Sequence, residues 1–197
     1  MDLRLHRKFH NLFYTLALMK LNGTLRIIII IFILALNIGC DQATKSMMRA
    51  HINYYDHYSF FNDHVTLLRA ENMGAFLSLG DKLVQPFRFI LLTLLPILAL
   101  LGALAYIIIK RNLSTLMVTG IIFCIGGGIS NLYDRVMYGS VTDFIHIKFG
   151  ALQTGVFNAA DVSIMMGLGL VLLDGWLSRK EDKEAKPEVI EESHSES

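Results

Sequence analysis

Two aspartates, Asp143 and Asp161, could carry acid–base chemistry. Each lies beside an aromatic residue, Phe144 or Phe157, and the loop between them is short enough to bring the two carboxyl groups together. Two carboxyl groups that share a site of low dielectric constant cannot both ionise easily, so one of them keeps its proton. Such a pair offers a general base and a general acid on either side of a water molecule, which is the requirement for peptide hydrolysis by aspartates.

Other polar residues could complete or replace this pair. Asp134 is a third carboxylate in the same region, and spacing alone does not choose between it and the other two. With Arg135 it could instead form a structural network, and Asn131 lies one turn before it. Asn158 and Asp161 are one helical turn apart and therefore share a face of a helix.

Asp41 and Lys45, at positions i and i+4, can form an ion pair on one face of a helix. The pair could be structural or could contact a substrate. Asp41 follows Gly39-Cys40, and the preceding apolar run has the outline of a lipoprotein signal that would place a lipid anchor on Cys40. Against that reading, Asn37 stands where an aliphatic residue is expected.

The composition shows which elements must position these residues. Of the 197 residues, 53% are hydrophobic and 18% are charged, whereas soluble domains average about 25% charged residues. So little polar surface could not coat a compact soluble core. The net charge of +1 gives no strong basic field, so we expect no nucleic-acid partner.

The apolar residues fall into four blocks, and a helix needs about 20 mostly apolar residues to cross a bilayer. We therefore predict an all-α membrane protein with four transmembrane helices, at about 25–44, 87–109, 113–133 and 156–177. A charge at membrane depth costs at least ~2.5 kcal/mol, so the polar residues that lie there are functional candidates.

Lys and Arg residues predict the orientation of the helices. Eleven of them fall on the side that holds both termini and the turn at 110–112, and seven fall on the other side. We expect both termini in the cytoplasm and outward loops at 46–86 and 134–155. The first loop alternates aromatic and polar residues, which predicts a small β-containing subdomain between helices 1 and 2. Residues 1–24 form a cytoplasmic extension, with Met1 or Met19 as alternative starts, and 179–197 form a disordered tail.

Five short motifs occur in order along the chain, and together they resemble those of lipoprotein signal peptidase, also called signal peptidase II. The motifs are Asp41-Gln42-Ala43-Thr44-Lys45, Asn72-Met73-Gly74-Ala75-Phe76, Gly127 through Asn131-Leu132-Tyr133-Asp134-Arg135, Val141-Thr142-Asp143-Phe144 and Phe157-Asn158-Ala159-Ala160-Asp161. The resemblance covers roughly residues 19–178.

The resemblance implies an aspartic endopeptidase of the bacterial inner membrane, with its active site at the outer leaflet boundary. Its substrate would be a diacylglyceryl-modified prolipoprotein, cut just before the lipidated Cys. The catalytic pair of the family falls on Asp143 and Asp161. Substrate-binding or supporting positions fall on Asp41, Lys45, Asn72, Gly74, Phe76, Asn131, Asp134, Arg135 and Asn158.

The resemblance further implies no metal and no organic cofactor, contact with membrane lipids, and inhibition by globomycin-type cyclic peptides. We also expect a monomer. The chain departs from the family at Ser130, where a Gly is usual, and residues 146–155 lack the usual Trp and Pro. Two other readings stay open, a small four-helix transporter or channel that relays ions through its aspartates, and a membrane protein anchored through Cys40.

Overall fold

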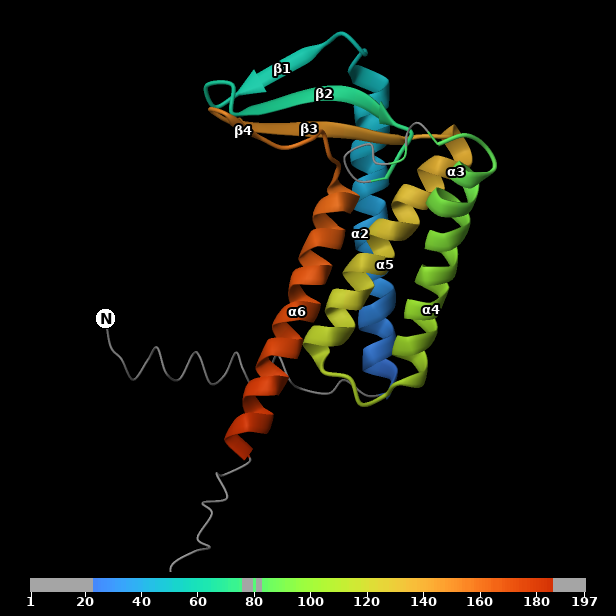
Figure 1. Cartoon of the computed structure of the whole chain (residues 1–197), viewed down its shortest axis with the longest axis vertical. Coiled ribbons are helices and arrows are strands. Elements are labelled where there is room, and N and C mark those ends of the chain that lie inside the picture. Colours follow the sequence, from blue (N-terminus) through green and yellow to red (C-terminus); the bar gives the residue numbers. More distant parts are fainter. Residues whose placement is uncertain (1–22, 76–79, 81–82, 186–197) are drawn as a thin grey trace, which may run out of the picture.

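The computed structural model describes residues 23–75, 80 and 83–185. In chain order the elements are α2 (Gly23–His51), β1 (His57–Phe60), β2 (Val65–Asn72), α3 (Phe87–Phe89), a π-helical segment (Ile90–Leu94), α4 (Leu95–Ile109), α5 (Thr115–Tyr138), β3 (Val141–Phe149), β4 (Leu152–Gln153) and α6 (Ala159–Ala185). Long helices run side by side, and the strands lie across one end of them (Figure 1). The predicted N-terminal extension up to residue 22, Phe76 and residues 186–197 of the tail fall outside the described residues.

Four helical segments are long and apolar enough to cross a membrane, as the sequence predicts. They are Gly23–His51, Phe87–Ile109, Thr115–Tyr138 and Ala159–Arg179. Many of their large apolar side chains point outward, among them Leu36, Leu98 and Met166, each more than half exposed. In a bilayer these side chains face lipid, while the helices satisfy their own backbone hydrogen bonds.

The helix ends differ from the prediction. The first helix continues past residue 44 to His51, and the third continues past residue 133 to Tyr138. The last begins at Ala159 and not at 156, and it runs on to Ala185, so residues 179–185 are helical where a disordered tail was expected. The predicted ends followed the apolar runs, but a helix continues through polar residues when other elements supply partners for them.

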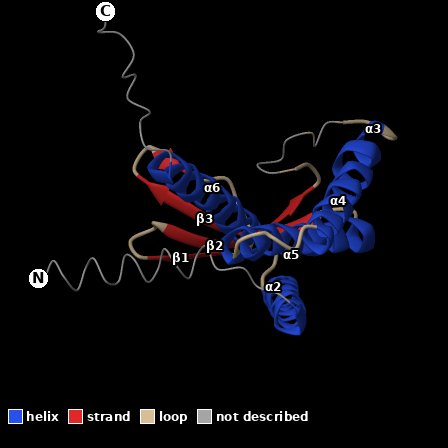
Figure 2. Ribbon diagram, turned by 90° about the horizontal axis from the view of Figure 1, so that it is seen from below, coloured by secondary structure: helices blue, strands red, loops and turns tan. Residues whose placement is uncertain are grey.

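Helix α5 lies at the centre of the bundle and packs against α2, α4 and α6. Figure 2 shows it between α4 and α6 in the view along the helices. Its contact with α6 depends on glycine, because a Cβ atom at Gly127 would collide with the carbonyl oxygen of Ala160. A Cβ at Gly120 would lie 2.8 Å from the carbonyl oxygen of Gly167. Small residues thus bring the backbones of α5 and α6 close together.

The described strands form one antiparallel sheet in the order β1-β2-β3-β4. The predicted subdomain between helices 1 and 2 therefore holds only half of the sheet, since β3 and β4 come from the second outward loop. Residues 145–149 of β3 alternate between apolar and polar, but Asp143 and Phe144 break this alternation at the start of the strand. The pairing sets Asn72 opposite Val141 and Ala70 opposite Asp143, which joins the ends of the two strands.

Candidate active site

The start of α6 positions Asp161. The side-chain oxygen of Asn158 accepts a hydrogen bond from the backbone N–H of Asp161 at 2.9 Å. In return Asp161 Oδ2 accepts one from the backbone N–H of Asn158 at 3.2 Å. This reciprocal pattern is a capping box, which satisfies two N–H groups at a helix start and fixes the carboxylate. The Asn-x-x-Asp spacing ahead of an apolar run could have located this helix start from the sequence.

Asp143 stands near the beginning of β3 and is only 2% exposed. Its Oδ1 accepts a hydrogen bond from Asn158 Nδ2 at 2.6 Å, and its Oδ2 accepts one from Asn72 Nδ2 at 2.9 Å. Asn158 therefore contacts both aspartates, through its side chain to Asp143 and through the capping box to Asp161. The two carboxylates that the sequence singled out meet around this one residue.

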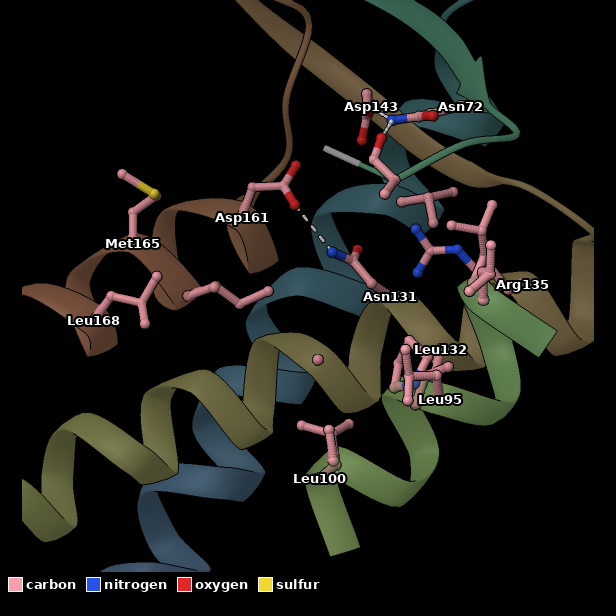
Figure 3. Close-up of a pocket in the computed structure, with 18 residues that line it drawn as sticks. Asn72, Leu95, Leu100, Asn131, Leu132, Arg135, Asp143, Asp161, Met165 and Leu168 are labelled. Carbon is pink, nitrogen blue, oxygen red and sulfur yellow. Dashed lines mark hydrogen bonds between the residues drawn. The ribbon is translucent and has the colours of Figure 1, made fainter. Parts of the chain in front are cut away.

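Asn131, from α5, supplies the remaining contact to the pair. Its Nδ2 donates to Asp161 Oδ1 at 3.0 Å. Each of the four carboxylate oxygens of Asp143 and Asp161 thus accepts a hydrogen bond, from an asparagine side chain or from the Asn158 backbone. Figure 3 shows Asn72 beside Asp143 and Asn131 beside Asp161, with both aspartates at the same end of a cavity.

The surroundings of Asp143 favour its protonated form. Burial raises the pKa of Asp143 from an ordinary 3.8 to about 6, and the negative charge of Asp161 adds to this rise. The hydrogen bonds from Asn72 and Asn158 oppose it. Burial disfavours a charged carboxylate because the charge loses its hydration. A proton on Asp143 beside a neighbouring carboxylate is the arrangement that acid–base chemistry by two aspartates needs.

The cavity has a volume of about 610 Å³ and lies between α4 and α6, with α5 behind it. Its polar end is formed by Asn72, Asn131, Arg135, Asp143 and Asp161. The rest of its lining is apolar and comes mainly from Leu91, Leu92, Leu95, Leu100, Leu132, Ile164, Met165 and Leu168. The site can therefore hold a polar backbone segment and a long apolar group at once.

Arg135 lies at the polar end of the cavity and holds the loop after β2. Its Nη2 donates to the carbonyl oxygen of Gly74 at 2.9 Å, and its buried Nε has no partner within the described residues. The backbone N–H of Gly74 donates to Asn72 Oδ1 at 2.9 Å, which orients the Asn72 amide toward Asp143. The structure thus places Asn72, Gly74 and Arg135 at the site. Phe76 lies outside the described residues.

Behind the cavity, Asp41, Lys45 and Asp134 form a buried ionic cluster. Lys45 Nζ is 2.7 Å from Asp41 and 3.0 Å from Asp134, and none of the three side chains is more than 1% exposed. The predicted pair of Asp41 and Lys45 is confirmed. The sequence associated Asp134 with Arg135, whereas the structure pairs Asp134 with Lys45. None of the three is among the residues that line the cavity.

Several supporting residues escaped the sequence prediction. Ser130, the departure from the usual Gly, donates to Asp41 Oδ2 at 2.7 Å and accepts from Gln42 at 2.8 Å. Asp41 also accepts from the backbone N–H of Ala160 at 2.7 Å, which ties α2 to the first turn of α6. Arg49 lies 3.6 Å from Asp134. The sequence did hold one signal for these residues. Polar residues at 41, 42, 45 and 49 recur at helical spacing and therefore share one face of α2.

Comparisons with known proteins agree with this geometry. The model of the family described as Signal peptidase (SPase) II matches residues 27–177. A protein of Streptococcus thermophilus named lipoprotein signal peptidase is 33% identical over 151 residues, which cover 77% of this chain and 94% of the relative. One of Aquifex aeolicus with the same name is 29% identical over 145 residues, covering 74% of this chain and 81% of the relative.

The fold also matches solved structures. A structure described as a bacterial membrane enzyme superposes with a TM-score of 0.70 at 23% identity, covering 90% of this chain and 99% of the other. A second with the same description gives a TM-score of 0.62 at 22% identity, covering 73% and 90%. The family model covers most of the chain, including every residue of the aspartate pair and its asparagine partners. The chain belongs to the signal peptidase II family.

Proposed function

We propose that this chain is an aspartic endopeptidase that removes signal peptides from diacylglyceryl-modified prolipoproteins by cutting just before the lipidated Cys. The observation that carries the proposal is the meeting of Asp143 and Asp161 around Asn158, at the polar end of a largely apolar cavity. Membership of the family, and relatives named lipoprotein signal peptidase, support the substrate class.

In the proposed mechanism the pair shares one proton, and its apparent pKa values belong to both groups together. The ionised carboxylate takes a proton from a water molecule as the water oxygen attacks the scissile carbonyl carbon. The protonated carboxyl group donates its proton to the carbonyl oxygen, which gives a neutral tetrahedral intermediate. Cleavage of the C–N bond follows when the nitrogen takes a proton from the first carboxyl group and the second recovers its proton from the hydroxyl.

The shape of the cavity suits a substrate that is both peptide and lipid. A helical segment hides its carbonyl groups, so the scissile region must be extended to be cut. The free Nε of Arg135 lies at the polar end, where it can donate a hydrogen bond to a substrate carbonyl. The amide nitrogen of Asn72 already donates to Ala75 and Asp143, so Asn72 holds the site in place. The leucine-rich part of the lining can receive the apolar groups next to the cut.

We place the protein in the bacterial inner (cytoplasmic) membrane, with both termini in the cytoplasm and the aspartates at the outer leaflet boundary. The excess of Lys and Arg on the side of the termini supports this orientation. We also propose that it acts as a monomer and that globomycin-type cyclic peptides block it. No cofactor enters the proposed mechanism.

The test is cleavage of a diacylglyceryl-modified prolipoprotein by the purified full-length chain in detergent, with the cut site read by mass spectrometry. Asp143→Asn and Asp161→Asn should each lower kcat at least about a thousandfold, since each removes one half of the acid–base pair. Asp174→Asn is the matched control, because it makes the same change at a buried position 13 residues further along α6. Full activity in either of the first two variants would exclude the proposed mechanism.

A transporter or a protein anchored through Cys40 would behave differently in this assay. A transporter would move ions in liposomes without cutting the substrate. An anchored protein would lose lipid labelling in Cys40→Ser, yet Cys40 lies inside the continuous helix α2. Family membership favours neither alternative.

A further inference from the structure

We propose that Lys45 is a positioning residue for the aspartate pair, because its ammonium group sets the orientation of the Asn131 amide and Asn131 in turn holds the Asp161 carboxylate. This inference rests on the proposed function and assigns a role within it. Lys45 cannot touch a substrate in the cavity, since its side chain is 0% exposed and does not line the cavity. Any effect on the reaction must therefore pass through a neighbour.

The hydrogen bonds of Lys45 show which neighbour that is. An ammonium group has three N–H donors and no acceptor. Two of its partners are the carboxylates of Asp41 and Asp134, at 2.7 and 3.0 Å. The third is Asn131 Oδ1 at 2.8 Å. With Arg49 beside Asp134, two cations already balance two carboxylates, so the contact to the neutral amide is not needed to balance charge.

The contact decides which way the Asn131 amide points. An asparagine side chain has an accepting oxygen at one corner and a donating nitrogen at the other. Because an ammonium group only donates, Asn131 Oδ1 must face Lys45, and Nδ2 is then directed to Asp161 Oδ1 at 3.0 Å. The opposite orientation would set the amide oxygen against a carboxylate and the amide nitrogen against an ammonium group. Asn158 Nδ2 supports the same orientation with a longer contact of 3.3 Å to Asn131 Oδ1.

The result is a relay of hydrogen bonds from α2 through α5 to α6. With Lys45 in place, one oxygen of Asp161 receives the Asn131 amide and the other receives the Asn158 backbone N–H. Both contacts orient the carboxylate toward the cavity. Without the ammonium group, the hydrogen bond that fixes the orientation of the Asn131 amide is missing. The amide can then rotate, and Asp161 Oδ1 loses its hydrogen-bond donor.

The experiment compares Asp41→Asn with the double variant Lys45→Met/Asp41→Asn. Lys45→Met alone would leave two buried carboxylates without their shared cation, which destabilises the fold. Removing the Asp41 carboxylate in both proteins avoids this, because the carboxylate that remains in the double variant, Asp134, keeps Arg49 at 3.6 Å. We expect kcat of the double variant to fall about 10- to 100-fold below that of the reference, as for a weakened electrostatic contact to a reacting group. KM should stay within about twofold, because Lys45 does not line the cavity.

A direct reading of the Asn131 side-chain amide by ¹H–¹⁵N NMR in micelles accompanies the kinetics, with the signal assigned by its loss in Asn131→Asp. The reference should give one pair of amide signals, and the double variant a shifted or doubled pair. An unchanged kcat, a higher KM at constant kcat, or an unchanged amide signal overturns the proposal. Failure of the wild-type chain to cut the substrate overturns the proposed function instead, and the amide signal then still decides the role of Lys45.

Discussion

At the scale of single residues, neutral amides dominate the surroundings of the aspartate pair. Asn72, Asn131 and Asn158 supply donors to both carboxylates, and no cation lies within ion-pair distance of either among the described residues. An amide satisfies the oxygen of a carboxylate without cancelling its charge. Burial can therefore keep a proton on one of the two groups while both stay fixed in place.

This arrangement predicts a pH dependence of stability. The pKa of Asp143 is raised by burial to about 6, so the folded protein binds this proton more tightly than the unfolded chain. The resulting stabilisation is complete below the ordinary pKa of 3.8 and is lost as pH rises through about 6. It corresponds to about 3 kcal/mol. In Asp143→Asn the side-chain amide stays neutral at every pH. As pH rises from 4.5 to 7 in detergent, the Tm of this variant should therefore fall less than the Tm of the wild type.

Thermal unfolding followed by tryptophan fluorescence measures both proteins across this range. Other titrating groups change the Tm of both proteins equally, so the difference in Tm between wild type and Asp143→Asn reports on Asp143 alone. Parallel curves for wild type and Asp143→Asn would show that burial does not raise this pKa.

Residue types in the site were predictable from the sequence, but some partnerships were not. Asp143, Asp161, Asn131 and Asn158 are recognisable because polar residues are rare beside apolar runs. The pairing of Lys45 with Asp134 depends on how α2 crosses α5, and no local spacing records that crossing. For the same reason the sequence left the effect of Ser130 undecided, whereas in the structure its hydroxyl group holds Asp41.

At the scale of elements, the contact between α5 and α6 sets the geometry of the pair. Asn131 belongs to α5 and Asp161 to α6, so their hydrogen bond requires the two helices to lie close together. Gly127 and Ala160 meet backbone to backbone just behind this contact. The close packing of glycine therefore supports the site without touching it.

Gly127→Ala should uncouple these two helices. The added methyl group would collide with the Ala160 carbonyl oxygen, which cannot move without moving the first turn of α6. We expect a loss of about 1–3 kcal/mol in stability and a fall in kcat of at least about tenfold. Gly169→Ala is the matched control in α6, because nothing lies within 4 Å of its added Cβ. Equal activity of the two variants in the cleavage assay would contradict the expectation.

The elements themselves were predictable to different degrees. Long apolar runs located the four spans, because length and hydrophobicity are enough to define a membrane helix. The sheet was only half predicted, since its strands pair across two loops that are far apart in the sequence. Strand pairing of this kind depends on where the helices bring the loops.

At the scale of the whole molecule, the chain is a bacterial membrane peptidase whose sheet and aspartate pair lie at one end of the helix bundle. The turn between α4 and α5 lies at the other end (Figure 1). A site at the end of the spans can admit water from the surface while its cavity borders the lipid. The proposed orientation directs this end outward.

Thiol labelling tests that orientation. In a Cys40→Ser/Cys124→Ala background, Tyr55→Cys lies beyond α2, where the residue is 93% exposed, and Asn112→Cys lies in the turn between α4 and α5. A membrane-impermeant maleimide should label the first in intact spheroplasts and the second only after lysis. The reverse pattern would mean that the aspartates face the cytoplasm.

The aspartate pair draws its hydrogen bonds from three elements that lie far apart in the sequence: β2 through Asn72, α5 through Asn131, and the start of α6 through Asn158. Synthesis delivers these elements in order, and α6 comes last. A nascent chain that has inserted three spans lacks Asp161 and the amide of Asn158, so it has neither the second carboxylate nor its link to Asp143. Under the proposed mechanism the chain therefore cannot cleave a peptide until biosynthesis is almost finished, so a partly made protein would not cut other membrane proteins.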